Sequence, residues 1–162
     1  MALGRGYLQV YTGNGKGKTT AAFGLALRAA GAGLRVFVVQ FAKAQPTGER
    51  EALRRFVPQV EVRQFGTGSF ITGEPSAADI AAAREGLACA RAAVSSGSWD
   101  LLVLDEASVA VTLGLFPVDE LLALVDAGDG RMEIVVTGRG ADPRLIERAD
   151  LVTEMREVRP YF

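Results

Sequence analysis

The sequence predicts an α/β fold in which a mostly parallel sheet is flanked by helices. Short, continuous apolar runs such as Arg35–Phe41 and Glu133–Thr137 have the pattern of strands that are buried on both faces. Segments with helical periodicity separate these runs, and strands that alternate with helices form parallel sheets. The chain has 162 residues, and we expect residues 1–162 to form a single domain with a substantial core.

A glycine-rich loop follows the first apolar run, within LQVYTGNGKGKTT (Leu8–Thr20), and opens onto an Ala-rich helix that ends near Ala30. A strand, a Gly/Lys loop and a helix in this order are the context of a phosphate-binding P-loop. Glycines let backbone N–H groups approach an anion, and the helix N-terminus adds its positive dipole end. Lys18 supplies a full positive charge, and the Thr19 hydroxyl is the usual magnesium ligand. The nucleotide-binding residues predicted from this loop are Gly13, Asn14, Gly15, Lys16, Gly17, Lys18, Thr19 and Thr20.

The loop departs from the strict GxxxxGK[ST] pattern at one position, because Thr12 stands where the first glycine is expected. The alternative interpretation is a solvated turn rich in glycine and lysine. The strand before the loop and the helix after it favour a nucleotide-binding loop.

Leu101–Glu106 (LLVLDE) is the second informative stretch, because four apolar residues lead into two adjacent carboxylates. This is the pattern of a Walker B strand, whose carboxylates hold Mg²⁺ directly or through water, or orient a nucleophile. The same letters occur by chance in many buried strands, but here they follow a P-loop at a distance of several strand–helix units. We therefore predict a metal site at Thr19, Asp105 and Glu106, and catalytic roles for Lys18 and Glu106.

The remaining pattern predicts helices and strands in alternation along the whole chain. These elements are a helix over Gly48–Phe56, a strand near a sheet edge over Val60–Phe65, a helix from the capping box of Ser76 and Asp79 to about Ser95, helices over Ala107–Gly114 and Pro117–Ala127, a helix from Pro143 to about Ala149, and a last strand over Leu151–Val158.

Three polar residues lie at the predicted strand ends, where open α/β sheets bind ligands. Gln40 and Lys43 follow the second strand, and either contact a ligand or are simply solvated there. Arg139, between two glycines, either contacts phosphate and joins the nucleotide-binding residues or is a solvated turn arginine.

Composition excludes several classes of chemistry. The chain has no histidine and one cysteine, Cys89, so it lacks the residues for Ser-His-Asp or Cys-His catalysis, for an intrachain disulfide and for a zinc cluster. A net charge of −1 offers no general electrostatic attraction to nucleic acid or an anionic membrane, and no membrane span or signal peptide is recognisable. We therefore expect a cytoplasmic protein whose catalysis uses positioning, a metal ion, Lys or Arg, and carboxylates.

Seven motifs together resemble one P-loop family, the ATP:corrinoid adenosyltransferases of the CobA/BtuR/CobO type. They occur in the order and approximate spacing of that family and cover nearly the whole chain. The motifs are TGNGKGKTTAAFG (Thr12–Gly24), VVQF (Val38–Phe41) with Lys43, GER (Gly48–Arg50), GTG (Gly66–Gly68), VLDE (Val103–Glu106), TGRG (Thr137–Gly140) and ADLVTEM (Ala149–Met155).

This resemblance implies a RecA-like P-loop fold and a transferase reaction. Members of the family transfer the 5′-deoxyadenosyl group of ATP to the Co(I) ion of a reduced corrinoid and release triphosphate. The loop would then hold the triphosphate, Lys18 would neutralise the leaving group, and Thr19 and Glu106, with Asp105, would bind Mg²⁺ or Mn²⁺. The small-molecule substrates implied are ATP and the corrinoid, and the candidate partners are a reductase such as a flavodoxin and a second copy of the chain.

The chain differs from the family in the loop that is expected to meet the corrinoid. Many members carry an aromatic-Thr-aromatic triplet there, whereas Ser69 and Ile71 occupy the aromatic positions in this chain, with Phe70 between them. Either cobalt is activated differently, or Phe70 and Ile71 supply the apolar wall. The predicted corrinoid-side residues are Gly66, Thr67, Gly68, Phe70 and Ile71.

Two other functions are compatible with the motifs. A P-loop ATPase or kinase with another acceptor would need only the P-loop and LLVLDE, and would release ADP and phosphate. A non-catalytic nucleotide-binding regulatory module would bind ATP without turning over a corrinoid.

Overall fold

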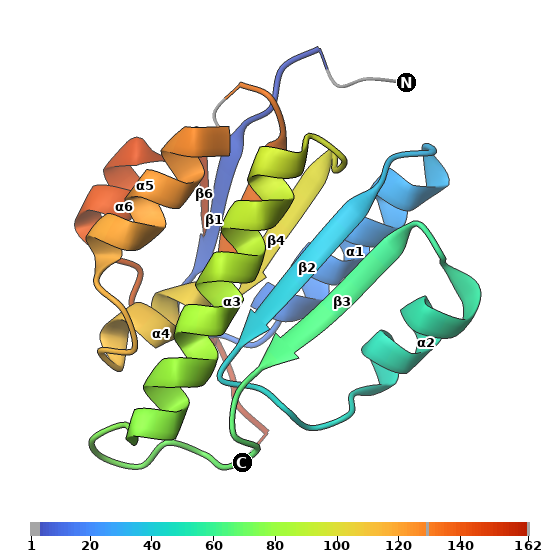
Figure 1. Ribbon diagram of the computed structural model, residues 1–162. Helices are drawn as coiled ribbons and strands as arrows, with labels where there is room; N and C mark the ends of the chain where they lie inside the picture. The colour runs from blue at the N-terminus through green and yellow to red at the C-terminus, as the bar shows by residue number, and fades with distance from the viewer. Residues whose placement is uncertain (1–3, 129, 162) are drawn as a thin grey trace.

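Six parallel strands in the order β3-β2-β4-β5-β1-β6 form the central sheet of the computed structural model (Figure 1). The structure describes residues 4–128 and 130–161. The elements in chain order are β1 (Leu8–Thr12), α1 (Lys18–Gly31), β2 (Val36–Phe41), α2 (Gly48–Phe56), β3 (Val60–Phe65), α3 (Ala77–Ser96), β4 (Leu101–Asp105), α4 (Ala107–Thr112), α5 (Val118–Gly128), β5 (Glu133–Thr137), α6 (Pro143–Arg148) and β6 (Leu151–Glu154).

The predicted α/β class is confirmed, and the sheet is parallel throughout, as a RecA-like P-loop fold requires. Every residue of β2 and β4 is buried, which agrees with their continuous apolar sequences. Successive side chains point to opposite faces of a strand, so each strand contributes to two cores. One core contains Phe37, Val39, Leu102 and Leu104, and the other contains Val36, Val38, Leu101 and Val103.

The helices cover both faces of the sheet, with α3, α4 and α5 on one face and α1 on the other (Figure 1). The predicted capping box begins α3: the Ser76 hydroxyl accepts from the Asp79 N–H at 3.2 Å, and the Asp79 carboxylate accepts from the Ser76 N–H at 2.9 Å. Two orphan donors of the first turn are thereby satisfied. No helix among the described residues is long and apolar enough to cross a membrane.

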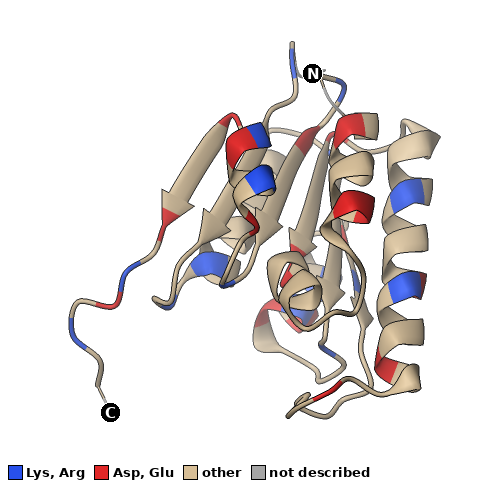
Figure 2. Ribbon diagram, turned by 90° about the vertical axis from the view of Figure 1, so that its left-hand side faces the viewer, with Lys and Arg blue, Asp and Glu red and all other residues tan. Residues whose placement is uncertain are grey.

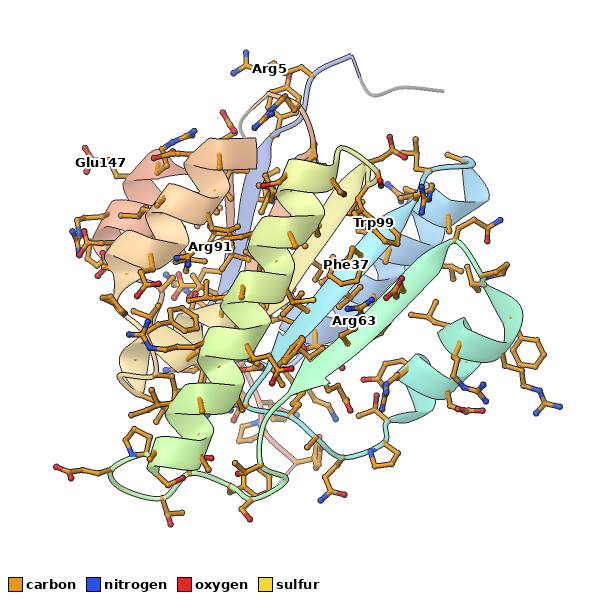
Figure 3. All side chains as sticks on the ribbon, viewed as in Figure 1. Arg5, Phe37, Arg63, Arg91, Trp99 and Glu147 are labelled. Carbon is orange, nitrogen blue, oxygen red and sulfur yellow. The ribbon has the colours of Figure 1, made fainter. Side chains whose placement is uncertain are left out.

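Two aromatic rings, those of Phe37 and Trp99, pack together beside the amino-terminal half of β2. The rings of Phe37 and Trp99 lie 5.0 Å apart, and their labelled side chains share one face of the sheet in Figure 3. The guanidinium of Arg35 lies 4.6 Å from the Trp99 ring centroid, and that of Arg63 lies 5.4 Å from the Phe37 ring centroid. Trp99 is the one tryptophan of the chain, so its fluorescence reports on this packing.

The expected last strand over Leu151–Val158 was too long, because β6 ends at Glu154. The chain then leaves the sheet, as Figure 2 shows for the segment that carries the C-terminus. The Met155 N–H still donates to the Thr12 carbonyl at 2.9 Å, but the Met155 carbonyl accepts from Gly15 of the loop after β1. A contact with the P-loop therefore replaces further pairing with the sheet. The expected edge position of Val60–Phe65 is confirmed, since β3 pairs with β2 alone.

The parallel arrangement brings the carboxyl ends of all strands to one edge of the sheet. The P-loop, the Asp-Glu pair and the segment around Arg139 follow β1, β4 and β5 at this edge. Ligands of open α/β sheets bind at such an edge. The sequence motifs, although far apart in the chain, therefore meet in one region.

Candidate functional site

The P-loop backbone is shaped by contact with the segment that follows β6. Gly13 and Gly17 have φ angles of +93° and +117°, which residues with a Cβ rarely adopt. A Cβ at Gly15 would lie 2.7 Å from the Met155 carbonyl oxygen, so this close approach also requires glycine. The Gly15 N–H donates to that oxygen at 2.7 Å. Sequence reasoning assigned this N–H to an anion, whereas in the structure it anchors the loop to residue 155.

The Lys18 side chain folds back over the loop that precedes it. Its Nζ donates to the carbonyl oxygens of Gly13 at 2.8 Å and Gly15 at 2.7 Å, and the residue is only 7% exposed. Burial lowers the pKa of Lys18, and nearby Arg139 lowers it further, whereas Glu106 opposes the change. The ammonium is therefore placed at the start of α1, beside the loop that would hold an anion.

Asp105 is the centre of a buried hydrogen-bond network at the end of β4. Its side chain is 0% exposed. Oδ1 accepts from the hydroxyls of Thr19 at 2.8 Å and Thr137 at 2.7 Å. Oδ2 accepts from Lys43 Nζ at 2.7 Å and Gln40 Nε2 at 2.9 Å. Four donors on one carboxylate satisfy its charge without solvent, which is how a buried carboxylate is tolerated.

Gln40 and Lys43 both donate to Asp105, so neither is merely solvated at the strand end. Contact of either residue with a ligand stays a prediction. Thr137 belongs to the TGRG motif, but the motif alone does not indicate its role in the network. Its hydroxyl donates to Asp105 and accepts from the Glu106 N–H at 3.0 Å. A threonine at the end of a buried strand was the available signal, but its partner depends on the strand order.

Glu106 follows Asp105 in a left-handed backbone conformation, with φ of 60°, directly before α4. Burial raises the pKa of Glu106, and the neighbouring Asp105 carboxylate adds to this, whereas Lys43, Lys18 and Arg139 act in the opposite direction. Non-glycine residues rarely adopt this φ, and such positions cluster at functional sites. Unlike Asp105, Glu106 lines an open cavity.

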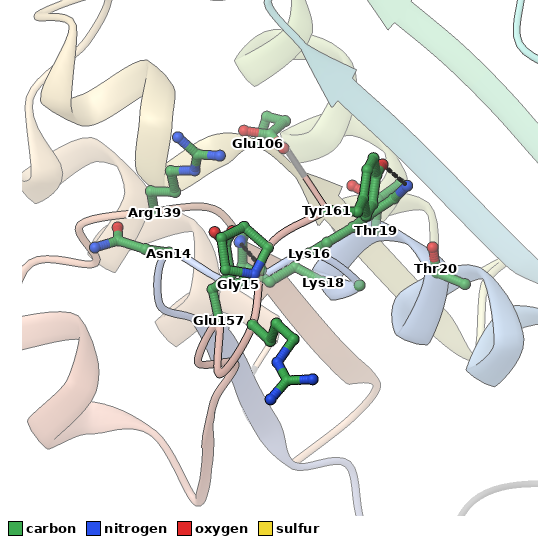
Figure 4. Close-up of a pocket in the computed structure, with 13 residues that line it drawn as sticks. Asn14, Gly15, Lys16, Lys18, Thr19, Thr20, Glu106, Arg139, Glu157 and Tyr161 are labelled. Carbon is green, nitrogen blue, oxygen red and sulfur yellow. Dashed lines mark hydrogen bonds between the residues drawn. The ribbon is translucent and has the colours of Figure 1, made fainter.

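A cavity of about 570 Å³ lies over the P-loop, as the close-up in Figure 4 shows. Among the predicted nucleotide-binding residues, Asn14–Thr20 and Arg139 line this cavity and Gly13 does not. Glu106 also lines it. Lys16, Lys18, Arg139 and Arg159 line it against the acidic Glu106 and Glu157, so cations predominate. The complete lining is Asn14, Gly15, Lys16, Gly17, Lys18, Thr19, Thr20, Glu106, Arg139, Glu157, Arg159, Pro160 and Tyr161.

Sequence reasoning missed the last four of these residues, which we call the C-terminal wall (Glu157, Arg159, Pro160 and Tyr161). Lys16 Nζ donates to the Tyr161 hydroxyl at 3.1 Å and lies 5.4 Å from the centroid of its ring, and Figure 4 draws this hydrogen bond. The sequence predicts a strand over Leu151–Val158, and no motif marks the residues after it. The hydrogen bond between the Gly15 N–H and the Met155 carbonyl holds the chain after β6 against the P-loop, and these residues follow it.

The predicted corrinoid-side residues lie elsewhere on the same edge of the sheet, and none of them lines the cavity over the P-loop. Phe70 is 99% exposed, whereas Ile71 is partly buried and packs against the hydrophobic core. The Thr67 hydroxyl donates to Asp79 at 2.7 Å, and the Gly68 carbonyl accepts from Gln45 at 3.2 Å. A Cβ at Gly66 would lie 2.7 Å from the Lys43 backbone nitrogen, so this glycine permits the loops after β2 and β3 to touch.

Comparison with known proteins identifies relatives along the whole chain. The model of the family described as ATP:corrinoid adenosyltransferase BtuR/CobO/CobP matches residues 4–162. A corrinoid adenosyltransferase of Pseudomonas aeruginosa is 42% identical over 159 residues, which cover 98% of this chain and 78% of the relative. A corrinoid adenosyltransferase of Escherichia coli K12 is 39% identical, and the corrinoid adenosyltransferase CobA of Salmonella typhimurium is 38% identical, each over 98% of this chain and 80% of the relative.

Proposed function

Because the chain belongs to the ATP:corrinoid adenosyltransferase family, we propose that it transfers the 5′-deoxyadenosyl group of ATP to the Co(I) ion of a reduced corrinoid. In this reaction a Co–C bond forms as the C5′–O bond breaks, and triphosphate leaves with the electron pair of that bond. The nucleophile belongs to the substrate, so the enzyme needs no nucleophilic side chain of its own. A chain without histidine is suited to such chemistry.

The observation that carries the proposal is the cationic cavity over the P-loop. Four cationic side chains line this cavity, those of Lys16, Lys18, Arg139 and Arg159. A triphosphate needs several positive charges at short range. We assign Gly13–Thr20 and Arg139 to the triphosphate. Lys18 would stabilise the negative charge that develops as triphosphate departs, once its ammonium exchanges the carbonyls of Gly13 and Gly15 for phosphate oxygens.

The residues present fit a magnesium ion, with Mn²⁺ as the alternative metal. Mg²⁺ is usually held by one or two protein oxygens together with substrate phosphates, and when bound it neutralises phosphate charge. The Thr19 hydroxyl donates its proton to Asp105, so its lone pairs remain available to a cation. Glu106 contributes a carboxylate on the cavity wall. Asp105 already accepts four hydrogen bonds, so we assign it to holding Thr19 and not to direct ligation.

The corrinoid is proposed to approach from the loop after β3. The exposed ring of Phe70 and the half-buried Ile71 give this loop an apolar component, and the Gly66–Gly68 segment precedes them. The proposal also includes a cytoplasmic reaction, a reductase such as a flavodoxin that supplies Co(I), and a homodimer. Residues 1–162 would form one nucleotide-binding domain.

The decisive experiment is to mix the protein with ATP, Mg²⁺ and chemically reduced cob(I)alamin or cobinamide under anaerobic conditions. We expect a light-sensitive adenosylcorrinoid and intact triphosphate in equal amounts. Formation of ADP and phosphate would instead identify an ATPase or kinase. ATP binding without a spectral change for either corrinoid would identify a binding module.

A further inference from the structure

Three polar side chains form a row across the carboxyl ends of β3, β2 and β4. Gln64 pairs in register with Gln40, and Gln40 pairs in register with Asp105. Residues in register on adjacent parallel strands point to the same face, so the three side chains lie next to one another. Gln64 Nε2 donates to Gln40 Oε1 at 3.0 Å, and Gln40 Nε2 donates to Asp105 Oδ2 at 2.9 Å. We call these three residues the amide row.

The amide row has a single hydrogen-bonding direction. Arg50 Nη1 donates to Gln64 Oε1 at 3.0 Å at one end, and the Asp105 carboxylate accepts at the other. A guanidinium only donates and a carboxylate only accepts, so both amides between them must turn their oxygens toward Arg50 and their nitrogens toward Asp105. Reversing either amide would bring two oxygens or two N–H groups face to face.

The amide row ends at Asp105, which orients the hydroxyl of Thr19 in the P-loop. Asp105 accepts from Gln40 through Oδ2 and from Thr19 through Oδ1, so a rotation of the carboxylate would disturb both bonds. Gln40 is 0% exposed, and a buried amide is costly unless its bonds are made. Gln64 Nε2 has a second acceptor, the Gln45 carbonyl at 3.0 Å, which also holds this amide in its orientation.

We propose that Gln40 and Gln64 are positioning residues that hold Asp105, and through it the Thr19 hydroxyl, in the orientation that binds the triphosphate. The proposal rests on the proposed function, because it requires the P-loop to bind ATP. Neither glutamine lines the cavity over the loop, so their effect reaches ATP only through Asp105.

A double-mutant cycle tests this inference. Gln40→Met and Gln64→Met keep the length of the side chain and remove its hydrogen bonds, and calorimetric titration with ATP and Mg²⁺ measures binding without a corrinoid. We expect each variant to weaken ATP binding by about three- to tenfold, the range of one hydrogen bond. The double variant should bind no more than about twofold more weakly than Gln40→Met, because Gln64 acts only through Gln40. Losses that multiply in the double variant would overturn the inference.

Gln64→Glu separates positioning from packing, and its partly exposed position lets the variant fold. The carboxylate keeps the size of the side chain and can still accept from Arg50, but it cannot donate to Gln40 Oε1. We expect Gln64→Glu to bind ATP at least as weakly as Gln64→Met. Wild-type affinity in this variant would mean that Gln64 only packs, and would refute the proposed role.

Gln59→Met is the matched control, because Gln59 is exposed and directly precedes β3, at the end of the strand opposite to Gln64, and this variant should bind ATP like the wild type. A wild-type protein that binds no ATP would refute the proposed function itself. If the wild type binds ATP and forms the adenosylcorrinoid, but the losses of the two single variants multiply in the double variant, only the positioning role of the amide row would be refuted.

Discussion

Lys16 and Tyr161 are joined by a 3.1 Å hydrogen bond, although 145 positions separate them in the chain. Through this pair the C-terminal wall touches the P-loop beside the cavity. Because Tyr161 both lines the cavity and orients a cationic side chain, its loss should weaken the nucleotide site without altering the sheet.

We expect Tyr161→Ala to raise KM for ATP by about three- to tenfold, with little change in kcat, because it removes a hydrogen bond and a cation–π contact. Tyr161→Phe should have a smaller effect, since the ring stays beneath the Lys16 ammonium. Steady-state kinetics with saturating corrinoid measure both values. Tyr7→Ala, before β1 at the other end of the sheet, controls for loss of a tyrosine, and an unchanged KM in Tyr161→Ala would contradict the assignment.

Lys18→Ala should lower turnover by about 10²- to 10³-fold, the range found when one group that stabilises developing charge is removed. The fold should persist, because the hydrogen bonds of the ammonium within the described part of the chain go to the carbonyls of Gly13 and Gly15 in its own loop. Trp99 fluorescence during thermal unfolding checks the fold, and triphosphate release checks turnover. Activity close to that of the wild type would mean that the phosphate site is wrongly assigned.

Glu106→Gln should stabilise the protein at neutral pH while abolishing activity. The pKa of Glu106 is raised in the folded protein from its ordinary value of 4.5, so the folded state holds the proton more tightly than the unfolded state. The protonated Glu106 side chain therefore gives its full contribution to stability below about pH 4.5, and this contribution is lost as pH rises through the folded-state pKa. Glutamine does not ionise, so Glu106→Gln does not lose this stability. The difference in Tm between the variant and the wild type should therefore grow from pH 4.5 to pH 7.

The same substitution at Glu147, an exposed residue of α6, controls for the removal of one charge. Thermal unfolding of the three proteins across this pH range measures the difference. A constant offset between Glu106→Gln and the wild type would show that burial of Glu106 does not cost stability.

Two glycines in helices should respond to alanine in opposite ways. A Cβ at Gly24 of α1 meets no heavy atom within 4 Å, so Gly24→Ala should stabilise by about 0.5–1 kcal/mol through helix propensity. A Cβ at Gly86 of α3 would lie 2.8 Å from Phe41 Cε1 and 3.1 Å from Phe65 Cβ. Gly86→Ala should therefore destabilise by about 1–2 kcal/mol. Chemical denaturation gives both values, and the same sign for the two would contradict the packing.

Much of the fold could be predicted from the sequence, because buried parallel strands such as β2 and β4 have continuous apolar sequences and the capping box marks the start of α3. The P-loop and the Asp-Glu pair were recognisable for the same reason: each is a local pattern. Register between strands is not local. The contact of Gln40 with both Gln64 and Asp105 depends on β2 lying between β3 and β4, which no single segment encodes.

The C-terminal wall shows the same limit. Apolar and polar residues from Leu151 to Val158 fit a strand, and β6 does begin there. The strand ends because Met155 approaches Gly15, a residue far away in the sequence that only the pairing of β6 with β1 brings close. Site residues that depend on such a contact have no signature in their own segment.

The place of β1 in the sheet has a consequence for how the protein is made. β1 pairs only with β5 and β6, with Leu8 opposite Ile134 and Gln9 opposite Leu151. During synthesis the P-loop strand must therefore wait for the last third of the chain before it can join the sheet, and such long-range pairing is slow. Nucleotide cannot assist the earlier steps, because its loop is not yet formed. ATP should therefore leave the rate of folding unchanged and slow unfolding, acting as a ligand of the completed structure alone.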